Sequence, residues 1–208
     1  MLFRSELEGW IGLINAENPD IVLIAGDVVD NFAKPLFEDK VYKTLRRIKA
    51  RYGVYMALGN HEYIGGEIDR NLNFLSQANV QVLRDSATLI DNTFYIIGRD
   101  DASRKYRNSL ANITDRLDHT KPMIVLDHQP SGFEEAQKCG IDLLLSGHTH
   151  GGQVFPISLV VKAVFKHSYG YHTANGTHFY ITSGLGIWGG KFRIGSRSEY
   201  VVIDLQGQ

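Results

Sequence analysis

Four short apolar runs in this chain each lead directly into a polar cluster, and this repeated pairing narrows the choice of fold. The runs are rich in Ile, Val and Leu, which is typical of strands buried on both faces. They lie at residues 21–25, 54–58, 123–127 and 142–146. Apolar residues at helical spacing separate them. Strands that alternate with helices predict a layered α/β domain with much parallel pairing.

The remaining segments complete the predicted architecture. Residues 38–51 have the spacing of one helix, and the apolar residues 155–165 (FPISLVVKAVF) predict a packed helix. From residue 167 onward, aromatic and β-branched runs flank Asn175-Gly176, which is a strong signal for a hairpin turn. Residues 199–205 are predicted as a last strand.

The polar clusters hold side chains that bind metals. Asp27 follows the first run, Asn60 the second and His128 the third, while His148 and His150 follow the fourth. Parallel strands of an open α/β sheet deliver their carboxyl ends to one edge, so we expect these five side chains to meet there. A mixed set of nitrogen and oxygen ligands suits Mn, Fe or Zn, and the absence of thiolates argues against a structural zinc site.

Four motifs in this order resemble those of the calcineurin-like metallophosphoesterases. They are GDVVD at 26–30, GNHE at 59–62, the lone His128, and GHTHGGQ at 147–153. GHTHGGQ, together with the later SGLGIW and FRIGSRSE, is similar to the small bacterial branch that includes YkuE-like and YaeI-like phosphohydrolases. The resemblance implies a layered β-sandwich flanked by helices. It also implies a single domain over residues 1–208 and hydrolysis of a phosphomonoester or phosphodiester by metal-activated hydroxide.

The resemblance also implies a role for each candidate ligand. Asp27 would bridge two divalent ions. Asn60, His128 and His148 would complete the shell of one ion, and His150 would belong to the other. Mn, Fe or Zn would serve, ideally as a pair.

Two further residues acquire catalytic roles from the same resemblance. His61 would lie near the leaving-group oxygen, where it protonates that oxygen or stabilises its charge. Asp30 would hold and polarise His61, which fixes the tautomer of the ring. The plainer interpretation of Asp30, a cap on the following segment, stays open.

The chain departs from the family pattern at one motif. The family normally opens with a strand that ends in Asp-x-His, and this sequence contains no Asp-x-His. The resemblance therefore predicts an incomplete domain whose N-terminal strand is missing, with the second metal site better preserved than the first and with impaired activity. A fragment of a longer chain and a genuine start at Met1 both remain open. The alternative function is a non-catalytic domain of the same fold that serves as a binding or scaffold module.

The overall charge restricts the partners of the chain. The formal net charge is -1 at pH 7, which provides no field for nucleic acid, so none is expected as a partner. No apolar run reaches the roughly 18–20 residues of a membrane span, and the chain as written is predicted to be cytoplasmic.

The resemblance implies a small phosphorylated substrate. It leaves open a lipid-linked substrate, an interfacial helix at residues 155–165, and a longer form that is membrane-associated or exported.

Overall fold

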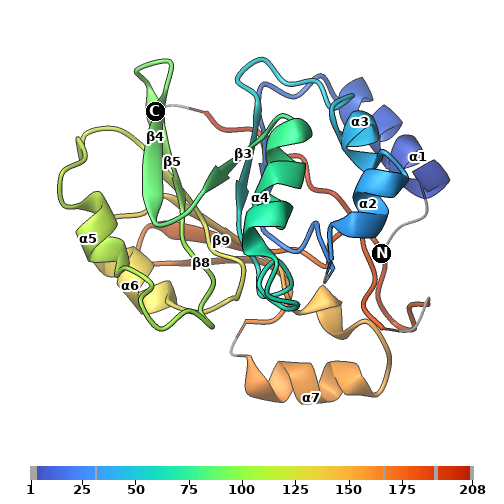
Figure 1. The fold of residues 1–208 in the computed structure, drawn as a ribbon. Coiled ribbons are helices and arrows are strands. Elements are labelled where there is room, and N and C mark those ends of the chain that lie inside the picture. The colour runs from blue at the N-terminus through green and yellow to red at the C-terminus, as the bar shows by residue number, and fades with distance from the viewer. Residues whose placement is uncertain (1–3, 31, 166, 190–191, 207–208) are drawn as a thin grey trace.

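The chain forms two β-sheets with helices along their outer faces, as seen in a computed structural model that describes residues 4–30, 32–165, 167–189 and 192–206 (Figure 1). The first part contains α1 (Arg4–Ala16), β1 (Val22–Ile24), α2 (Lys34–Glu38), α3 (Val41–Leu45), β2 (Val54–Ala57), α4 (Ile68–Gln77) and β3 (Val80–Leu83). The second part begins with β4 (Ser86–Ile90), β5 (Phe94–Gly98), α5 (Leu110–Thr114), β6 (Met123–Leu126), α6 (Phe133–Lys138) and β7 (Leu143–Ser146). It continues with the short 3-10 helix η1 (His150–Gly152), α7 (Ile157–Val164), β8 (Gly170–Ala174) and β9 (Thr177–Ile181).

Parallel pairing dominates both sheets. The first sheet has the order β1-β2-β3, and both of its pairings are parallel. The second has the order β4-β5-β6-β7-β9-β8, in which β5, β6, β7 and β9 run parallel and β4 and β8 are antiparallel edge strands. The loops that follow β1 and β2 therefore leave one sheet, and those that follow β6 and β7 leave the other.

The side chains of β2 show how the layers are held together. Successive side chains of a strand point to opposite faces. Met56 packs with Phe74 of α4 on the outer face of the first sheet. Tyr55 packs with Ile96 and Leu126 of the second sheet, so a core lies between the two sheets. A third core covers the outer face of the second sheet beneath α5 and α6. The predicted layered α/β sandwich is confirmed.

The hairpin prediction is confirmed, and two other predictions are wrong. Asn175 and Gly176 join β8 to β9, and both have positive φ, as a tight hairpin turn requires. The helix expected at residues 38–51 is much shorter: α2 ends at Glu38, Lys40 adopts a left-handed conformation (φ 53), and α3 covers only Val41–Leu45. Residues 199–206 form no strand, since none of the described strands pairs with them.

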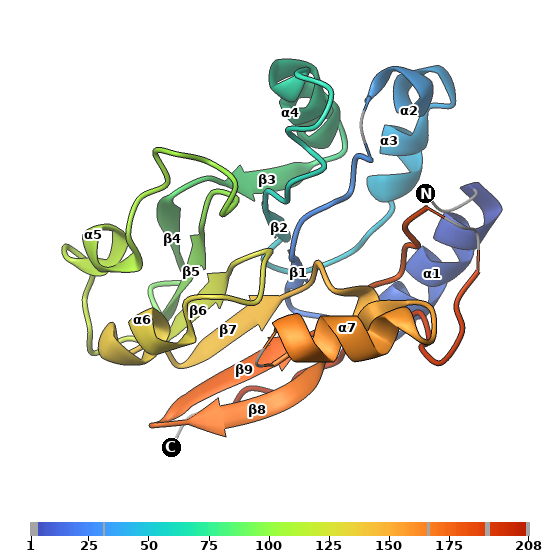
Figure 2. The same cartoon turned by 90° about the horizontal axis from the view of Figure 1, so that it is seen from below.

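Helix α7 forms within the predicted segment, but the predicted packing is wrong. Ile157, Val160 and Val164 are exposed. Figure 1 shows α7 below the rest of the molecule, and Figure 2, which is seen from below, shows it in front. Among the described residues, no helix has the length and apolar content needed to cross a membrane.

Candidate metal centre

The backbone at the end of β1 turns sharply and presents Asp27. Gly26 and Asp27 both have positive φ, 94° and 59°, which glycine adopts freely and aspartate tolerates. The backbone N–H of His61 donates to Oδ1 of Asp27 over 3.0 Å. A Cβ at Gly59 would overlap the same carboxylate, so only glycine fits there. The loops after β1 and β2 therefore contact each other at the carboxylate of Asp27.

His128 connects the two sheets. Its Nδ1 lies 2.6 Å from the carbonyl oxygen of Ala25, which can only accept, so Nδ1 carries the hydrogen. That bond directs the other ring nitrogen, Nε2, to a point 3.0 Å from Oδ2 of Asp27. Metal-bound histidines are usually oriented by such a bond from the second ring nitrogen.

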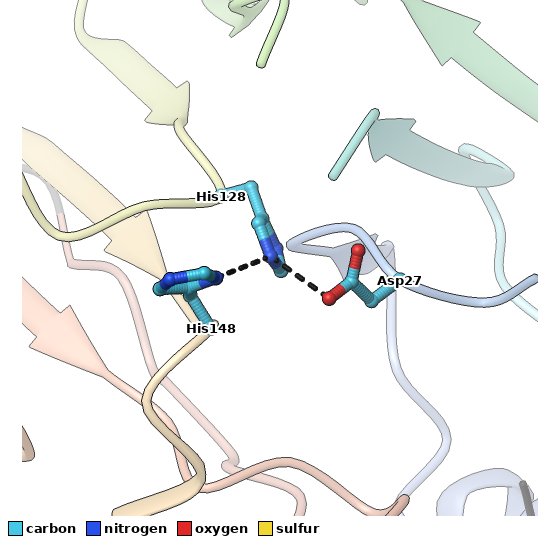
Figure 3. A group of neighbouring side chains, drawn as sticks. All are labelled: Asp27, His128 and His148. Atoms are coloured by element: carbon cyan, nitrogen blue, oxygen red, sulfur yellow. Dashed lines mark hydrogen bonds and ion pairs between the residues drawn. The ribbon is translucent and has the colours of Figure 1, made fainter. Parts of the chain in front are cut away.

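His148 completes the group shown in Figure 3. Its Nδ1 lies 3.2 Å from Nε2 of His128 and 3.1 Å from Oδ1 of Asn60. The ligand atoms of Asp27, His128 and His148 all lie within 4.8 Å of one another, close enough to share one ion. The side chains point toward a common centre from β1, β6 and β7 (Figure 3). Four of the five predicted ligands are therefore brought together.

His150 lies outside that group. Burial, assisted by the positive charge of Arg193, lowers the pKa of His150 to about 4, so its ring is neutral at pH 7. Its Nδ1 is buried, and among the described residues it has no hydrogen-bond partner. A buried, neutral imidazole nitrogen without a partner is suited to bind a cation.

The electrostatics of the group suit a cation. Burial raises the pKa of Asp27, but the hydrogen bond and charge of His128 outweigh it and lower that pKa below its ordinary value. Burial lowers the pKa of His128, but the Asp27 carboxylate reverses the effect and raises that pKa. Burial and the neighbouring His128 lower the pKa of His148. The carboxylate thus attracts positive charge to a centre lined by imidazole nitrogens and an amide oxygen, a donor set that fits Mn, Fe or Zn.

Glu62 is a site residue to which the sequence alone assigns no role. It is fully buried, and its Oε2 accepts hydrogen bonds from the backbone N–H groups of Asp27 (2.9 Å) and Gly59 (2.8 Å). Its Oε1 accepts from the N–H of Val29 over 2.9 Å. Burial and the negative charge of Asp27 raise the pKa of Glu62 to about 7. The last letter of GNHE was the only signal for this residue, which ties the loops after β1 and β2 together.

Asp30 and His61 form the predicted pair. Nδ1 of His61 lies 2.9 Å from Oδ1 of Asp30 and 2.8 Å from its carbonyl oxygen. Both oxygens of Asp30 are acceptors, so Nδ1 of His61 carries the hydrogen. The other ring nitrogen, Nε2, takes no part in the pair. The His61 side chain is partly exposed, so solvent or a ligand can reach it.

A buried ion network surrounds Asp127, the residue before His128. The preceding residue, Asp127, pairs with Arg107 and, at 3.4 Å, with Arg99. Arg99 also pairs with Glu135 over 2.9 Å. Burial nevertheless raises the pKa of Asp127 to about 6. Asp127 thus lies next to a predicted ligand in sequence but has a separate set of partners.

The fold and the cluster together define a class. A layered α/β sandwich that gathers carboxylate, amide and imidazole ligands at its strand ends is the scaffold of a metal-dependent phosphoesterase. Residues 4–152 match the calcineurin-like phosphoesterase family. The chain belongs to that family.

Relatives and solved structures agree with this assignment. The chain is 35% identical to an uncharacterized metallophosphoesterase of Campylobacter jejuni, Cj0846, over 100% of this chain and 56% of the relative. It is 31% identical to a Danio rerio protein named transmembrane protein with metallophosphoesterase domain, over 98% of this chain and 49% of that protein. The chain thus spans about half the length of these curated relatives. A 5'-nucleotidase precursor from Thermus thermophilus has the same fold, with a TM-score of 0.52 and 17% identity over 87% of this chain and 42% of that chain.

Proposed function

We propose that this chain hydrolyses a small phosphate ester, either a monoester or a diester, with the help of a divalent cation. The observation that carries the proposal is the convergence of Asp27, His128 and His148, whose ligand atoms lie within 4.8 Å of one another. These residues come from strands of two different sheets. A scaffold without a cation would have no need to gather two imidazoles and a carboxylate around the buried ring of His128.

Asp27, Asn60, His128 and His148 would hold the cation, which is Mn, Fe or Zn. When bound, it supplies charge stabilisation for phosphoryl oxygens and lowers the pKa of water. His150 would serve a second ion. Because His150 lies outside the group of three, we expect the ion held by Asn60, His128 and His148 to bind more tightly than the ion at His150.

His61 is the proposed proton donor to the leaving oxygen. Its Nδ1–H donates to Asp30, which fixes the ring and leaves Nε2 to face the substrate. With the ring held in this orientation, Nε2 can pass a proton to the leaving oxygen as the ester bond breaks. Asp30 acts through His61 and is a positioning residue.

The substrate and the location of the whole protein are proposed only at a coarse level. The solved structure of similar fold is named for action on 5'-nucleotides, which favours a small phosphorylated compound for this chain as well. The Danio rerio relative is named a transmembrane protein, so we propose that this protein is membrane-associated as well.

Hydrolysis of bis-p-nitrophenyl phosphate tests the proposal. We expect EDTA-treated protein to be inactive and to regain turnover with Mn²⁺, and His148→Ala to lose both bound metal and turnover. His119→Ala is the matched control, because His119 bonds to the carbonyl of Thr114 and lies outside the cluster. Protein that binds no cation and shows no turnover would instead support the binding or scaffold module.

A further inference from the structure

Helix α7 has an apolar surface that the described part of the chain does not cover. Ile157, Val160 and Val164, at helical spacing i, i+3 and i+7, are 54%, 61% and 69% exposed. Its sequence ISLVVKAV contains only Ser158 and Lys162 as polar residues. A helix that is apolar around most of its circumference is normally buried. An exposed apolar patch of this kind indicates an interaction site.

A second exposed segment is bonded to the start of this helix. The N–H of Phe155 donates to the carbonyl of Ile194 over 2.8 Å, and the N–H of Ile194 donates to the carbonyl of Gln153 over 2.8 Å. The side-chain amide of Gln153 bonds to both backbone groups of Trp188, at 2.6 and 2.7 Å. Phe155, Trp188 and Ile194 are all more than half exposed. We call these three residues and the exposed face of α7 the apolar platform.

The stretch of sequence that contains the platform carries charge of one sign. Residues 143–198 contain no Asp or Glu. The same stretch contains five basic residues: Lys162, Lys166, Lys191, Arg193 and Arg197. The whole chain carries a net charge of -1, so positive charge is concentrated in this part of the sequence. A partner that is apolar inside and anionic at its surface matches this composition.

We propose that the apolar platform docks on the surface of a bilayer that contains anionic lipid. Exposed aliphatic side chains enter the boundary between headgroups and acyl chains, and a tryptophan such as Trp188 is favoured at that depth. Each lysine or arginine near an anionic surface adds electrostatic attraction. A bilayer supplies both the apolar layer and the negative charge, whereas an apolar protein groove supplies only the first.

Docking at the platform would bring the membrane close to the metal centre. A Cβ at Gly152 would overlap the Cα of Ser158, so the first turn of α7 lies directly on the loop that carries His148 and His150. At the other end of the helix, the ring of Phe165 lies 6.0 Å from the ring of His148. An eight-residue helix is only about 12 Å long, so the cluster lies near the proposed interface. The docking itself does not depend on the proposed phosphoesterase activity.

Vesicle flotation tests the docking. The chain is mixed with vesicles of phosphatidylcholine and phosphatidylglycerol at 3:1, and in parallel with vesicles of phosphatidylcholine alone. We expect the wild type to bind the anionic vesicles at least tenfold more tightly. The double variant Val160→Glu/Val164→Glu should lose at least tenfold in that affinity. Leu13→Glu, at an exposed apolar position on α1, is the matched control and should bind like the wild type.

A second measurement places the contact in the lipid. Trp10 and Trp188 are the only tryptophans, so Trp10→Phe leaves Trp188 as the single reporter. We expect brominated acyl chains to quench its fluorescence. Absence of wild-type flotation, equal losses in Leu13→Glu, or an unquenched Trp188 would each overturn the proposal. A dimer that Val160→Glu/Val164→Glu dissociates, without vesicle binding, would also overturn it. Turnover of a soluble ester, measured in the same samples, reports the proposed function separately.

Discussion

Glu62 illustrates how one buried side chain can position a candidate ligand by bonding to its backbone. Its two oxygens accept three backbone hydrogen bonds, from Asp27, Val29 and Gly59. Two of these donors lie in the loop after β1 and the third begins the loop after β2. Loss of an acceptor leaves buried N–H groups unpaired, which costs about 1–3 kcal/mol each.

Glu62→Gln should therefore weaken both the fold and the site. The amide places an NH₂ group where a carboxylate oxygen accepted, so we expect a loss of about 2 kcal/mol in the free energy of unfolding and a weaker affinity for Mn²⁺. Urea denaturation and calorimetric titration measure the two quantities. Glu38→Gln is the control, because Glu38 forms only an exposed pair with Lys34 and should cost less than about 0.5 kcal/mol. Equal effects in the two variants would contradict the role of Glu62.

His61→Ala separates catalysis from metal binding. Removal of a positioned general acid lowers turnover by about 10²–10⁴-fold, while the metal content should stay close to that of the wild type. Turnover of bis-p-nitrophenyl phosphate and elemental analysis of the same samples provide the two readouts. Unchanged turnover would remove His61 from the mechanism.

His150 makes the stability of the metal-free protein depend on pH. Its pKa is lowered from 6.5 to about 4, so between these values the folded state binds fewer protons than the unfolded state. The contribution of His150 to stability is thus lost as the pH falls from about 6.5 to about 4. Measured relative to His150→Gln, the free energy of unfolding of the wild type should decline across this window. If the difference in the free energy of unfolding between the two proteins did not change with pH, the lowered pKa of His150 would be wrong.

The sequence predicted most of the candidate ligands but not the buried residues that lie beside them and hold the same loops. Asp27, Asn60, His128 and His148 each follow a recognisable apolar run, so position along the chain was enough to bring them together. Glu62 and Asp127 lie beside them in the same motifs. The role of Glu62 depends on backbone N–H groups that surround its carboxylate after folding, and that of Asp127 on arginine side chains. The spacing of residues along the chain does not predict these partners.

At the level of elements, the contact between η1 and α7 needs a glycine. Gly152 has a φ of +78° and faces the Cα of Ser158. Gly152→Ala should cost the roughly 1–2 kcal/mol of a left-handed alanine plus the displacement of α7. Gly66→Ala is the control, since Gly66 has a φ of +71° with open space around its Cβ position. Urea denaturation should show a larger loss for Gly152→Ala, and equal losses would mean that the helix contact contributes nothing.

The spacing of apolar residues predicted where helices and strands lie better than it predicted what they pack against. The strands were predicted because short apolar runs rich in Ile, Val and Leu are typical of strands buried on both faces. The late start of α3, directly after Lys40, was missed because a single left-handed residue leaves no mark on hydrophobic spacing. The exposure of α7 was missed for a different reason: an apolar helix in the sequence looks the same whether it meets the core or the surface.

At the scale of the whole molecule, the candidate site lies where two sheets meet. Asp27 and Asn60 follow strands of the first sheet, while His128 and His148 follow strands of the second. The structure brings these four side chains together but leaves His150 outside the group, and the prediction of convergence assumed one shared sheet edge. The side-chain bond from His128 to the Ala25 carbonyl joins the sheets, and a cation held by both should join them more strongly.

Anomalous diffraction from a crystal soaked in Zn²⁺ tests this arrangement most directly. We predict a peak among Asp27, His128 and His148, at about 2.0–2.2 Å from a carboxylate oxygen and from a nitrogen of each ring. A peak elsewhere, or none at saturating Zn²⁺, would contradict the assignment of these residues as the metal centre.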